Sequence, residues 1–423
     1  MKLYLKNIGK IEEAFIEMNG ITVIAGENDT GKSTVGRALF AVFNGFTNIQ
    51  TQIDKEREDS IALLMIRMAF SANLTPSELT GMNKLARDIV AEADQYKENN
   101  EKLERRLWDF LIRQIGDKIR NFDDTLIQET VGRIIDILNI KNEDFVNTVL
   151  GKRLKAEFYG QVCNVFSETP GSVSLKIKNS GIMVTVTPNG EVQVQNPNML
   201  SLHTEIVYLD DPFILDDSKQ FSYIYDPAYL DHRDHLRRKF FITERRGNLA
   251  DEIIAKEKLE RIYEKIASVC SGAIVKEKTS EIGYRVGRSD KVLNVRNLST
   301  GLKTFVILKT LLMNGTIEQN GTIILDEPEI HLHPEWQLLF AELIVLIQKE
   351  FGVHVLLNTH SPYFLNAIEV YTAKYGIAEK CKYYLASLNG NSSVIKDVSE
   401  HMEEIYSKLA RPLQVLENER GNL

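Results

Sequence analysis

A loop of eight residues, 26–33, with the sequence GENDTGKS, constrains the fold of this chain more than any other feature. It fits the pattern GxxxxGK[ST], and it lies between an apolar run at 21–25 and a stretch at 34–43 with apolar residues at helical spacing. Between a strand and a helix, this pattern turns backbone N–H groups onto phosphate oxygens at the positive end of the helix. The alternative is a chance glycine turn, which the flanking elements argue against.

The residue types of this loop predict how it would hold a nucleotide. Lys32 is expected to reach the β and γ phosphate oxygens, and the Ser33 hydroxyl to take a Mg²⁺ position. ATP and Mg²⁺ are therefore the predicted ligands. The candidate phosphate-binding residues are Gly26, Asn28, Asp29, Thr30, Gly31, Lys32, Ser33 and Thr34.

A second segment, 322–328 with the sequence TIILDEP, is an apolar strand that ends in two acids. A buried strand delivers such carboxylates to the edge of a sheet. We expect Asp326 to hold Mg²⁺ and Glu327 to orient and deprotonate the water that attacks the γ-phosphate. Alternatively, the acids only cap the next turn, which Pro328 would suit; the phosphate loop favours the catalytic interpretation.

Two further segments complete the pattern. Residues 297–301, NLSTG, precede an apolar helical stretch, so Ser299 is a candidate N-cap. The start of this helix is then a candidate for a second anion-binding site. Alternatively, Ser299 only caps the helix. Residues 358–362, NTHSP, follow another apolar strand. His360 taken alone is more often a core or turn histidine than a functional one.

The order of these four segments resembles the ABC-type ATPases of the SMC, RecF and OLD group. The opening LxNIGxIEEAFI and the segment EIHLHPEWQ after the second acid are also similar to this group. The resemblance covers about residues 1–45 and 295–370. It implies an α/β fold, an ABC-type P-loop ATPase head with a mixed sheet, and an enzyme that converts ATP and water to ADP and phosphate.

The resemblance also implies partners and site residues. In that group the LS-x-G segment of one subunit closes over the nucleotide of another, which implies a homodimer or higher homo-oligomer with shared ATP sites. Ser299 and Gly301 would then contact the γ-phosphate of the nucleotide that another subunit holds. His360 would sense the same γ-phosphate. The resemblance thus implies three catalytic residues, Lys32, Glu327 and His360. Gln161 is the match to the glutamine that completes the Mg²⁺ shell, although an ordinary polar residue at a strand end is the alternative.

The signature departs from the usual LSGGQ in one way that bears on closure. Thr300 replaces a glycine, so a side chain stands where backbone usually approaches the phosphate. Lys303 follows and could compensate electrostatically.

Residues 51–150 differ from the rest of the chain, with dense charge, few glycines and helical spacing, and predict a helical insertion or arm. The head would comprise 1–50 and 151–423. Period-two patterns predict strands at 3–8, 11–16 and 21–25 and hairpins at 173–194. Helices are expected at 249–269, 298–313 and 335–349, and strands at 322–325 and 353–357.

Composition limits the alternatives. The net charge of −8 argues against a surface that binds nucleic acid everywhere, although the basic stretch 233–246, with Phe240 and Phe241 within it, leaves local binding possible. A solvated helix face paired with local acids is the favoured alternative for that stretch. Apolar runs are too short for a membrane span and no signal peptide is evident, which predicts a cytoplasmic protein with no membrane contact. His331 and His333 could suggest a metal, but no further ligands lie nearby.

Three functions fit these features. The first is an ATP-hydrolysing switch that resembles the ATPase subunit of bacterial anti-phage systems such as PARIS or Septu. This switch would control a nuclease of the Toprim or HNH type. The nuclease is expected to be a separate protein, because the 40 or so residues after Tyr383 are too few for a nuclease. The second is a DNA-repair or chromosome-maintenance ATPase that clamps DNA. The third is a nucleotide-gated scaffold with little hydrolysis. No chemistry follows from the sequence of 208–213, YLDDPF.

Overall fold

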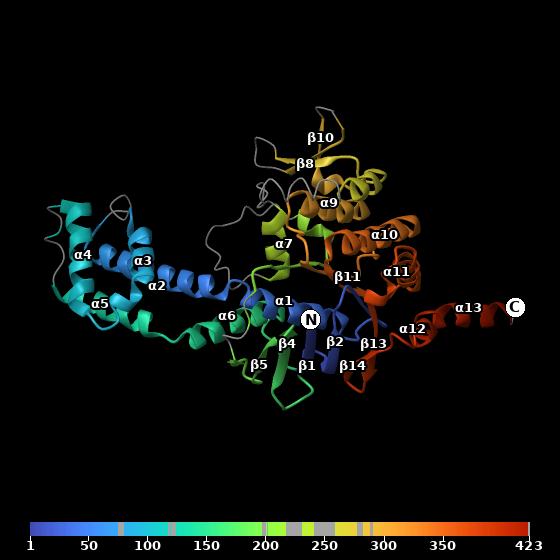
Figure 1. The fold of residues 1–423 in the computed structure, drawn as a ribbon, viewed down its shortest axis with the longest axis horizontal. Coiled ribbons are helices and arrows are strands. Elements are labelled where there is room, and N and C mark those ends of the chain that lie inside the picture. The colour runs from blue at the N-terminus through green and yellow to red at the C-terminus, as the bar shows by residue number, and fades with distance from the viewer. Residues whose placement is uncertain are drawn as a thin grey trace. The chain divides into compact units, whose positions relative to one another are not determined.

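The computed structural model describes residues 1–74, 80–116, 119, 124–196, 200, 202–216, 231–240, 259–276, 282–287 and 291–421. The chain divides into two compact units (Figure 1). The first contains Met1–Thr47 and Val149–Leu423, and the second contains Asn48–Thr148. The first unit holds all the predicted site residues.

An 11-stranded mixed sheet organises the described part of the first unit. Its strands stand in the order β6-β5-β4-β1-β2-β14-β13-β3-β12-β11-β7. The prediction of an α/β protein with a mixed sheet is confirmed. The strand bounds are Lys2–Ile8 (β1), Ile11–Glu17 (β2), Ile21–Ala25 (β3), Gly171–Ile177 (β4), Ser180–Val186 (β5), Val192–Gln195 (β6), Ile206–Leu209 (β7), Thr322–Asp326 (β11), His354–Thr359 (β12), Cys381–Asn389 (β13) and Ser392–Asp397 (β14).

Five neighbouring strands, β13, β3, β12, β11 and β7, run parallel. Every residue of β3, β7 and β11 is buried, which explains their largely apolar sequences, because a parallel strand is covered on both faces. The carboxyl ends of β3, β11 and β12 lie at one edge, with Asp326 opposite Asn358 and Asn358 opposite Ile24 in register. Ligands of open α/β sheets bind at such an edge.

The other half of the sheet is mostly antiparallel. β1 pairs with β2 and β4, and the hairpin strands β4, β5 and β6 follow outward. Alternate residues of β4 are buried, as expected for a sheet with one covered face. A separate three-stranded sheet is formed by β8 (Ala273–Lys276), β9 (Ile282–Arg285) and β10 (Val292–Asn294).

Helices of the first unit pack on the central sheet (Figure 1). α1 contacts β1, β4, β7, β11 and β12, and α10 packs against α11 and β12. The predicted helix 249–269 is described only from residue 259, and residues 259–267 are helical. The helix bounds are Lys32–Phe46 (α1), His232–Phe240 (α7), Thr300–Met313 (α9), Pro334–Phe351 (α10), Pro362–Lys374 (α11), Glu403–Leu409 (α12) and Arg411–Gly421 (α13).

The second unit is helical and has a hydrophobic core of its own. Buried residues of that core include Ile61, Leu103 and Ile134. α6 begins in this unit and ends in the first. The helix bounds are Ile49–Ser71 (α2), Met82–Ala91 (α3), Asn100–Ile115 (α4), Asp124–Asn139 (α5) and Asn142–Glu157 (α6). Within the described residues, none of the helices has the length and apolar character needed to cross a membrane.

Candidate functional site

The phosphate loop connects β3 to α1 and turns through two left-handed residues. Asp29 has φ +64° and Gly31 has φ +79°. Glycine adopts this conformation without strain, which suits Gly31 at the N-cap of α1. The buried Thr30 hydroxyl donates to the Glu27 carbonyl at 2.8 Å, and Lys10 pairs with the exposed Asp29. The loop is therefore held by the Thr30 side chain within it and by Lys10 from the turn between β1 and β2.

Lys32 is buried, with 4% of its surface exposed, and points back into the loop. Its Nζ donates to the carbonyl oxygens of Gly26 at 3.1 Å and Glu27 at 2.8 Å. The same Nζ lies 3.3 Å from Oε1 of Glu327, which follows β11. The structure thus brings together two residues that the sequence predicts to act on one phosphate group.

His360 joins this pair from the end of β12. Its Nδ1 lies 3.3 Å from Glu327 Oε1. The contact with His360 lowers the pKa of Glu327, and Lys32 acts in the same direction, so that the carboxylate is ionised at neutral pH. The contact with Glu327 raises the pKa of His360. Glu327 also has φ +49°, a strained backbone conformation of the kind that concentrates at functional sites.

Asp326 lies one residue earlier and accepts two hydrogen bonds, one on each oxygen. Tyr208 on β7 donates to Oδ2 at 2.8 Å, and the Asn358 amide on β12 donates to Oδ1 at 2.9 Å. Burial, together with the nearby Asp326 carboxylate, raises the pKa of Tyr208 well above its ordinary value, so the hydroxyl keeps its proton. Sequence reasoning assigned no role to Tyr208 or Asn358.

The side chains of Ser33 and Asp326 have the chemistry of a Mg²⁺ site. The Tyr208 hydroxyl lies 3.5 Å from the Ser33 carbonyl and 2.8 Å from Asp326, which places the start of α1 beside the acid. A hydroxyl and a carboxylate are the hard oxygen donors that Mg²⁺ prefers. The amide oxygen of Asn358 is also buried without a hydrogen-bond partner among the described residues.

Gln161 lies in the loop after α6, next to the beginning of α1. The backbone of that loop bonds β1 through Gly9 N and Val162 O at 2.8 Å, and Gly9 in turn faces the Thr34 side chain. The Gln161 side chain is exposed. No hydrogen bond joins it to Ser33 or Asp326 in the described structure, so its part in a Mg²⁺ shell stays a prediction.

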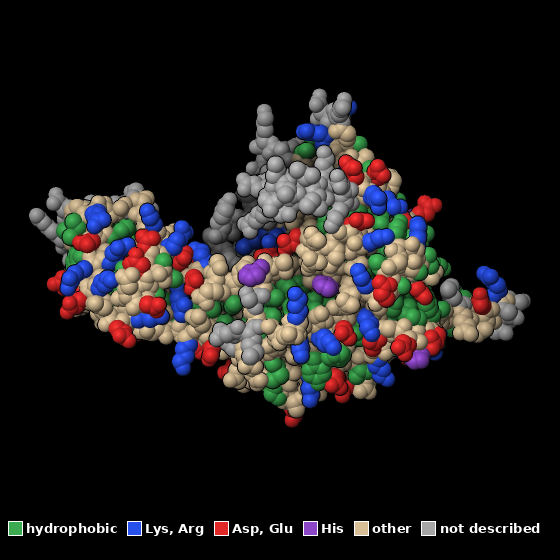
Figure 2. All heavy atoms as spheres, viewed as in Figure 1, with side chains coloured by type: hydrophobic (Ala, Val, Ile, Leu, Met, Phe, Trp, Pro, Cys, Tyr) green, Lys and Arg blue, Asp and Glu red, His purple; other side chains and the backbone are tan. Residues whose placement is uncertain are grey.

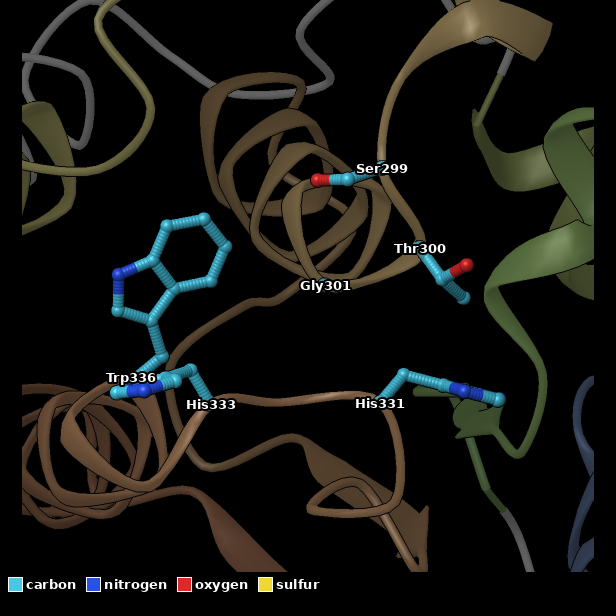
Figure 3. A pocket seen from close by; sticks show the side chains of 6 residues that line it. All are labelled: Ser299, Thr300, Gly301, His331, His333 and Trp336. Carbon is cyan, nitrogen blue, oxygen red and sulfur yellow. The ribbon is translucent and has the colours of Figure 1, made fainter.

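A separate cavity of about 410 Å³ lies at the start of α9 (Figure 3). One wall is the α9 start with Ser299, Thr300 and Gly301, and the facing wall is the segment from His331 to Trp336. The Ser299 side chain makes no capping hydrogen bond. A Cβ on Gly301 would lie 2.9 Å from the His331 carbonyl oxygen, so a glycine is required for this close approach.

Lys303 does not compensate for Thr300 in the way that the sequence suggested. It is buried and donates to Asp216 at 2.5 Å and to the Arg296 carbonyl at 3.3 Å. Its ammonium group therefore ties α9 to the segment after β7 instead of facing the cavity. Thr300 itself lines the cavity.

A buried ionic network packs against the Tyr208 ring. The His232 ring stacks on Tyr208 with centroids 4.2 Å apart. Its Nδ1 lies 2.7 Å from Glu157 and its Nε2 lies 3.0 Å from Asp210. Burial opposes the charge, but hydrogen bonds to Asp210 and Glu157 raise the pKa of His232 to about 9. Despite burial, His232 and Arg233 lower the pKa of Asp210 to about 2.

The basic stretch 233–246 is largely neutralised where it is described. Arg233 pairs with Asp210 at 2.8 Å, Arg237 pairs with Asp234 at 2.6 Å, and Lys239 pairs with Glu205. Residues 241–246, including Phe241, Arg245 and Arg246, lie outside the described residues. On the visible face of the second unit, acidic and basic side chains are interleaved (Figure 2). The three ion pairs of Arg233, Arg237 and Lys239 favour the solvated-face interpretation of the described part of the stretch.

Part of the chain matches a known protein family and is similar to curated proteins. Residues 197–366 match the family described as AAA domain, putative AbiEii toxin, Type IV TA system. The retron Vc95 probable ATPase of Vibrio cholerae serotype O1 biovar El Tor is 26% identical over 102 residues. That match covers 22% of this chain and 19% of the relative, so the chain spans about a fifth of that protein's length.

Some solved structures with a low similarity to this chain are head domains of SMC proteins. The SmcHead bound to the C-winged helix domain of ScpA has a TM-score of 0.45 and 13% identity, with 95% of this chain and 98% of that chain covered. The SMC head domain from Thermotoga maritima has a TM-score of 0.39 and 12% identity, with 94% and 98% covered.

Proposed function

We propose that this chain, which is similar to the ABC-type ATPases of the SMC, RecF and OLD group, binds and hydrolyses ATP at the edge of its parallel strands. The observation that carries the proposal is the convergence of Lys32 and His360 on one oxygen of Glu327, each at 3.3 Å. Lys32 begins α1 after the loop that follows β3, and Glu327 and His360 directly follow β11 and β12; these three strands are neighbours in the sheet. The AAA-domain match over residues 197–366, which include Glu327 and His360, supports the same activity.

The residues divide the chemistry among themselves. The loop from Gly26 to Thr34, including Asn28 and Asp29, cradles the phosphates, and Lys32 exchanges its contacts with the loop carbonyls for β and γ phosphate oxygens. Glu327, which is ionised, orients a water molecule for in-line attack and accepts its proton. His360 holds the Glu327 carboxylate and donates to the phosphate group as negative charge develops.

Ser33 and Asp326 would hold Mg²⁺, and Gln161 is proposed to complete its shell. The ion supplies neutralisation of the charge on the β and γ phosphate oxygens. The two hydrogen bonds on Asp326 keep its carboxylate in one orientation.

The cavity at the α9 start would receive the nucleotide of a second copy of the chain. Ser299 and Gly301 line the cavity at the N-terminus of α9, and the Ser299 side chain makes no capping hydrogen bond; a helix N-terminus favours a phosphate group. In the resulting homodimer or higher homo-oligomer, ATP would lie between two chains and its hydrolysis would change their association.

In the cell, we propose, this ATPase acts in the cytoplasm as the regulatory subunit of an anti-phage system that controls a separate nuclease. The resemblance to PARIS and Septu ATPases and the match to a retron's probable ATPase support this role. A DNA clamp is less favoured because the described residues Arg233, Arg237 and Lys239 of the basic stretch are paired with acids.

Affinity capture of the tagged protein from its host distinguishes the anti-phage role from the DNA clamp. A co-purifying nuclease supports the anti-phage role, and protected DNA without a nuclease contradicts it.

The activity itself is tested by Lys32→Ala. Removal of the ammonium group is expected to weaken ATP binding about 100-fold or more, since the variant loses the charge that the triphosphate requires. Lys55→Ala, on the surface of the second unit, is the matched control and should bind ATP as the wild type does. Equal ATP affinity of Lys32→Ala and wild type by calorimetry would refute the proposed site.

A further inference from the structure

Glu329 is a third acid in the turn after β11, and the proposed hydrolysis reaction does not use it. Its side chain is only 2% exposed, although acids are rarely buried so completely. Burial raises the pKa of Glu329. A buried acid costs free energy that an apolar side chain of similar size would avoid, so packing alone does not account for it.

The side-chain hydrogen bonds of Glu329 come from the end of β12. Its Oε1 accepts a hydrogen bond from the Thr359 hydroxyl and another from the His360 backbone N–H, the latter at 3.2 Å. The Thr359 hydroxyl in turn accepts from the Ser361 N–H at 3.0 Å. One carboxylate oxygen thus organises three successive residues, 359 to 361, where the chain leaves β12 for α11.

This arrangement fixes His360 with respect to Glu327. Both carboxylates belong to the same turn, in which Ile330 N donates to the Glu327 carbonyl at 3.2 Å. The His360 Nδ1 lies 3.3 Å from Glu327 Oε1 but 3.9 Å from Glu329 Oε1. Glu329 therefore holds the backbone of His360, whereas Glu327 meets its imidazole ring.

We propose that Glu329 is the positioning residue for His360: it locks the end of β12 to the turn that carries the catalytic acid. The inference rests on the proposed function, because a fixed distance between His360 and Glu327 matters for turnover only if these two residues hydrolyse ATP. In the described structure no hydrogen bond or ion pair joins the Glu329 side chain to the phosphate loop or to Lys32. Its loss should therefore slow turnover without weakening ATP binding.

The test compares Glu329→Ala with Glu329→Gln. The alanine variant loses the acceptor, and we expect kcat to fall about tenfold or more while the ATP KM and Kd change less than about threefold. Glutamine keeps an acceptor oxygen at the same place and should recover most of the lost turnover. Thr359→Val, which removes the hydroxyl, should lower kcat as Glu329→Ala does, and Thr359→Ser should restore it.

Glu342 provides a control for the loss of a buried acid. It lies on α10, is buried, and accepts hydrogen bonds from Lys265, Lys374 and Tyr375. Glu342→Ala should lower the melting temperature but leave kcat at the wild-type value. If Glu329→Ala does not fold, the Thr359 pair decides the question.

A second readout does not depend on turnover. In protein labelled with ¹⁵N at histidine, the imidazole resonances of His360, identified by their loss in His360→Gln, should shift in Glu329→Ala and return in Glu329→Gln. Wild-type kcat in Glu329→Ala, or unchanged His360 resonances, would overturn the positioning role. A wild-type protein that hydrolyses no ATP would instead refute the proposed function, and the histidine spectra alone would then decide the role of Glu329.

Discussion

At the scale of single residues, the orientation of Asp326 depends on two donors that lie far from it in sequence. Tyr208 and Asn358 each occupy one carboxylate oxygen, and neither belongs to the turn that carries the acid. Partners of this kind align a metal-binding carboxylate, and their loss typically weakens metal binding. Tyr208 is also placed against the start of α1, so that one phenol touches both proposed Mg²⁺-binding elements.

Tyr208→Phe isolates this contribution. The variant keeps the ring that stacks on His232 but leaves Asp326 Oδ2 without its donor. We expect the Mg²⁺ concentration for half-maximal ATP hydrolysis to rise roughly tenfold, in the range of such supporting contacts. A Mg²⁺ titration of the steady-state rate measures it.

Tyr384 is the control for removal of a buried phenol hydroxyl. It lies on β13 and accepts a hydrogen bond from the Glu17 N–H at 2.8 Å, away from Asp326. Tyr384→Phe should leave the Mg²⁺ requirement unchanged. An unchanged requirement in Tyr208→Phe as well would show that the phenol does not support the metal-binding acid.

The sequence could nominate Lys32, Asp326, Glu327 and His360 because each stands in a short motif with its own chemistry. It could not nominate Tyr208 or Glu329. Tyr208 reaches Asp326 only because β7 pairs beside β11, a contact between residues 118 positions apart. A tyrosine in a short apolar strand carries no local sign of such a contact.

At the scale of elements, a buried ionic network joins the ends of α6, α7 and β7. His232 at the start of α7 lies between Glu157, the last residue of α6, and Asp210, the residue after β7. Arg233 adds two hydrogen bonds to the same oxygen of Asp210. The charged form of His232 therefore holds three elements around Tyr208.

This network predicts a pH dependence of stability. The pKa of His232 is raised from 6.5 to about 9, so its stabilising contribution is complete below pH 6.5 and is lost as pH rises through 9. We expect the free energy of unfolding to fall by roughly 3 kcal/mol over that range. Urea unfolding of wild type and His232→Gln at pH 6 to 10 measures it. If both proteins lose the same stability, His232 is not the responsible group.

Elements with a strong local pattern could be predicted from the sequence, and others could not. The largely apolar runs of β3, β11 and β12 and the helical spacing of α1 and α10 mark elements that the structure contains. The strands β7 and β13 were not predicted. β13, near the end of the chain, pairs with β3 near its beginning, and such long-range pairing depends on tertiary packing more than on local propensity.

At the scale of the whole molecule, residues 197–366 match an AAA domain, which agrees with the resemblance to ATPases that the motifs indicate. The sequence placed the helical insertion at 51–150, and the second compact unit spans Asn48–Thr148. A change in charge density and glycine content marks that segment, whereas its function has no comparable sign in the sequence.

The shared ATP site predicts complementation between two inactive variants. Lys32→Ala lacks a working phosphate loop, and Ser299→Arg blocks the cavity at the α9 start. A mixed dimer holds one intact site, made of the loop of the Ser299→Arg chain and the α9 start of the other. Mixing equal amounts should therefore restore about a quarter of wild-type ATP hydrolysis if dimers pair at random. No recovery after exchange of subunits would contradict a site shared between chains.

The central claim is that Glu327 activates water for ATP hydrolysis at this sheet edge, and Glu327→Gln tests it most directly. Incubation with ATP and Mg²⁺, followed by measurement of released phosphate and of the bound nucleotide, gives turnover and binding together. We predict ATP affinity within about threefold of wild type, turnover lower by about 100-fold or more, and ATP instead of ADP on the protein. Turnover of Glu327→Gln at the wild-type rate would contradict the account.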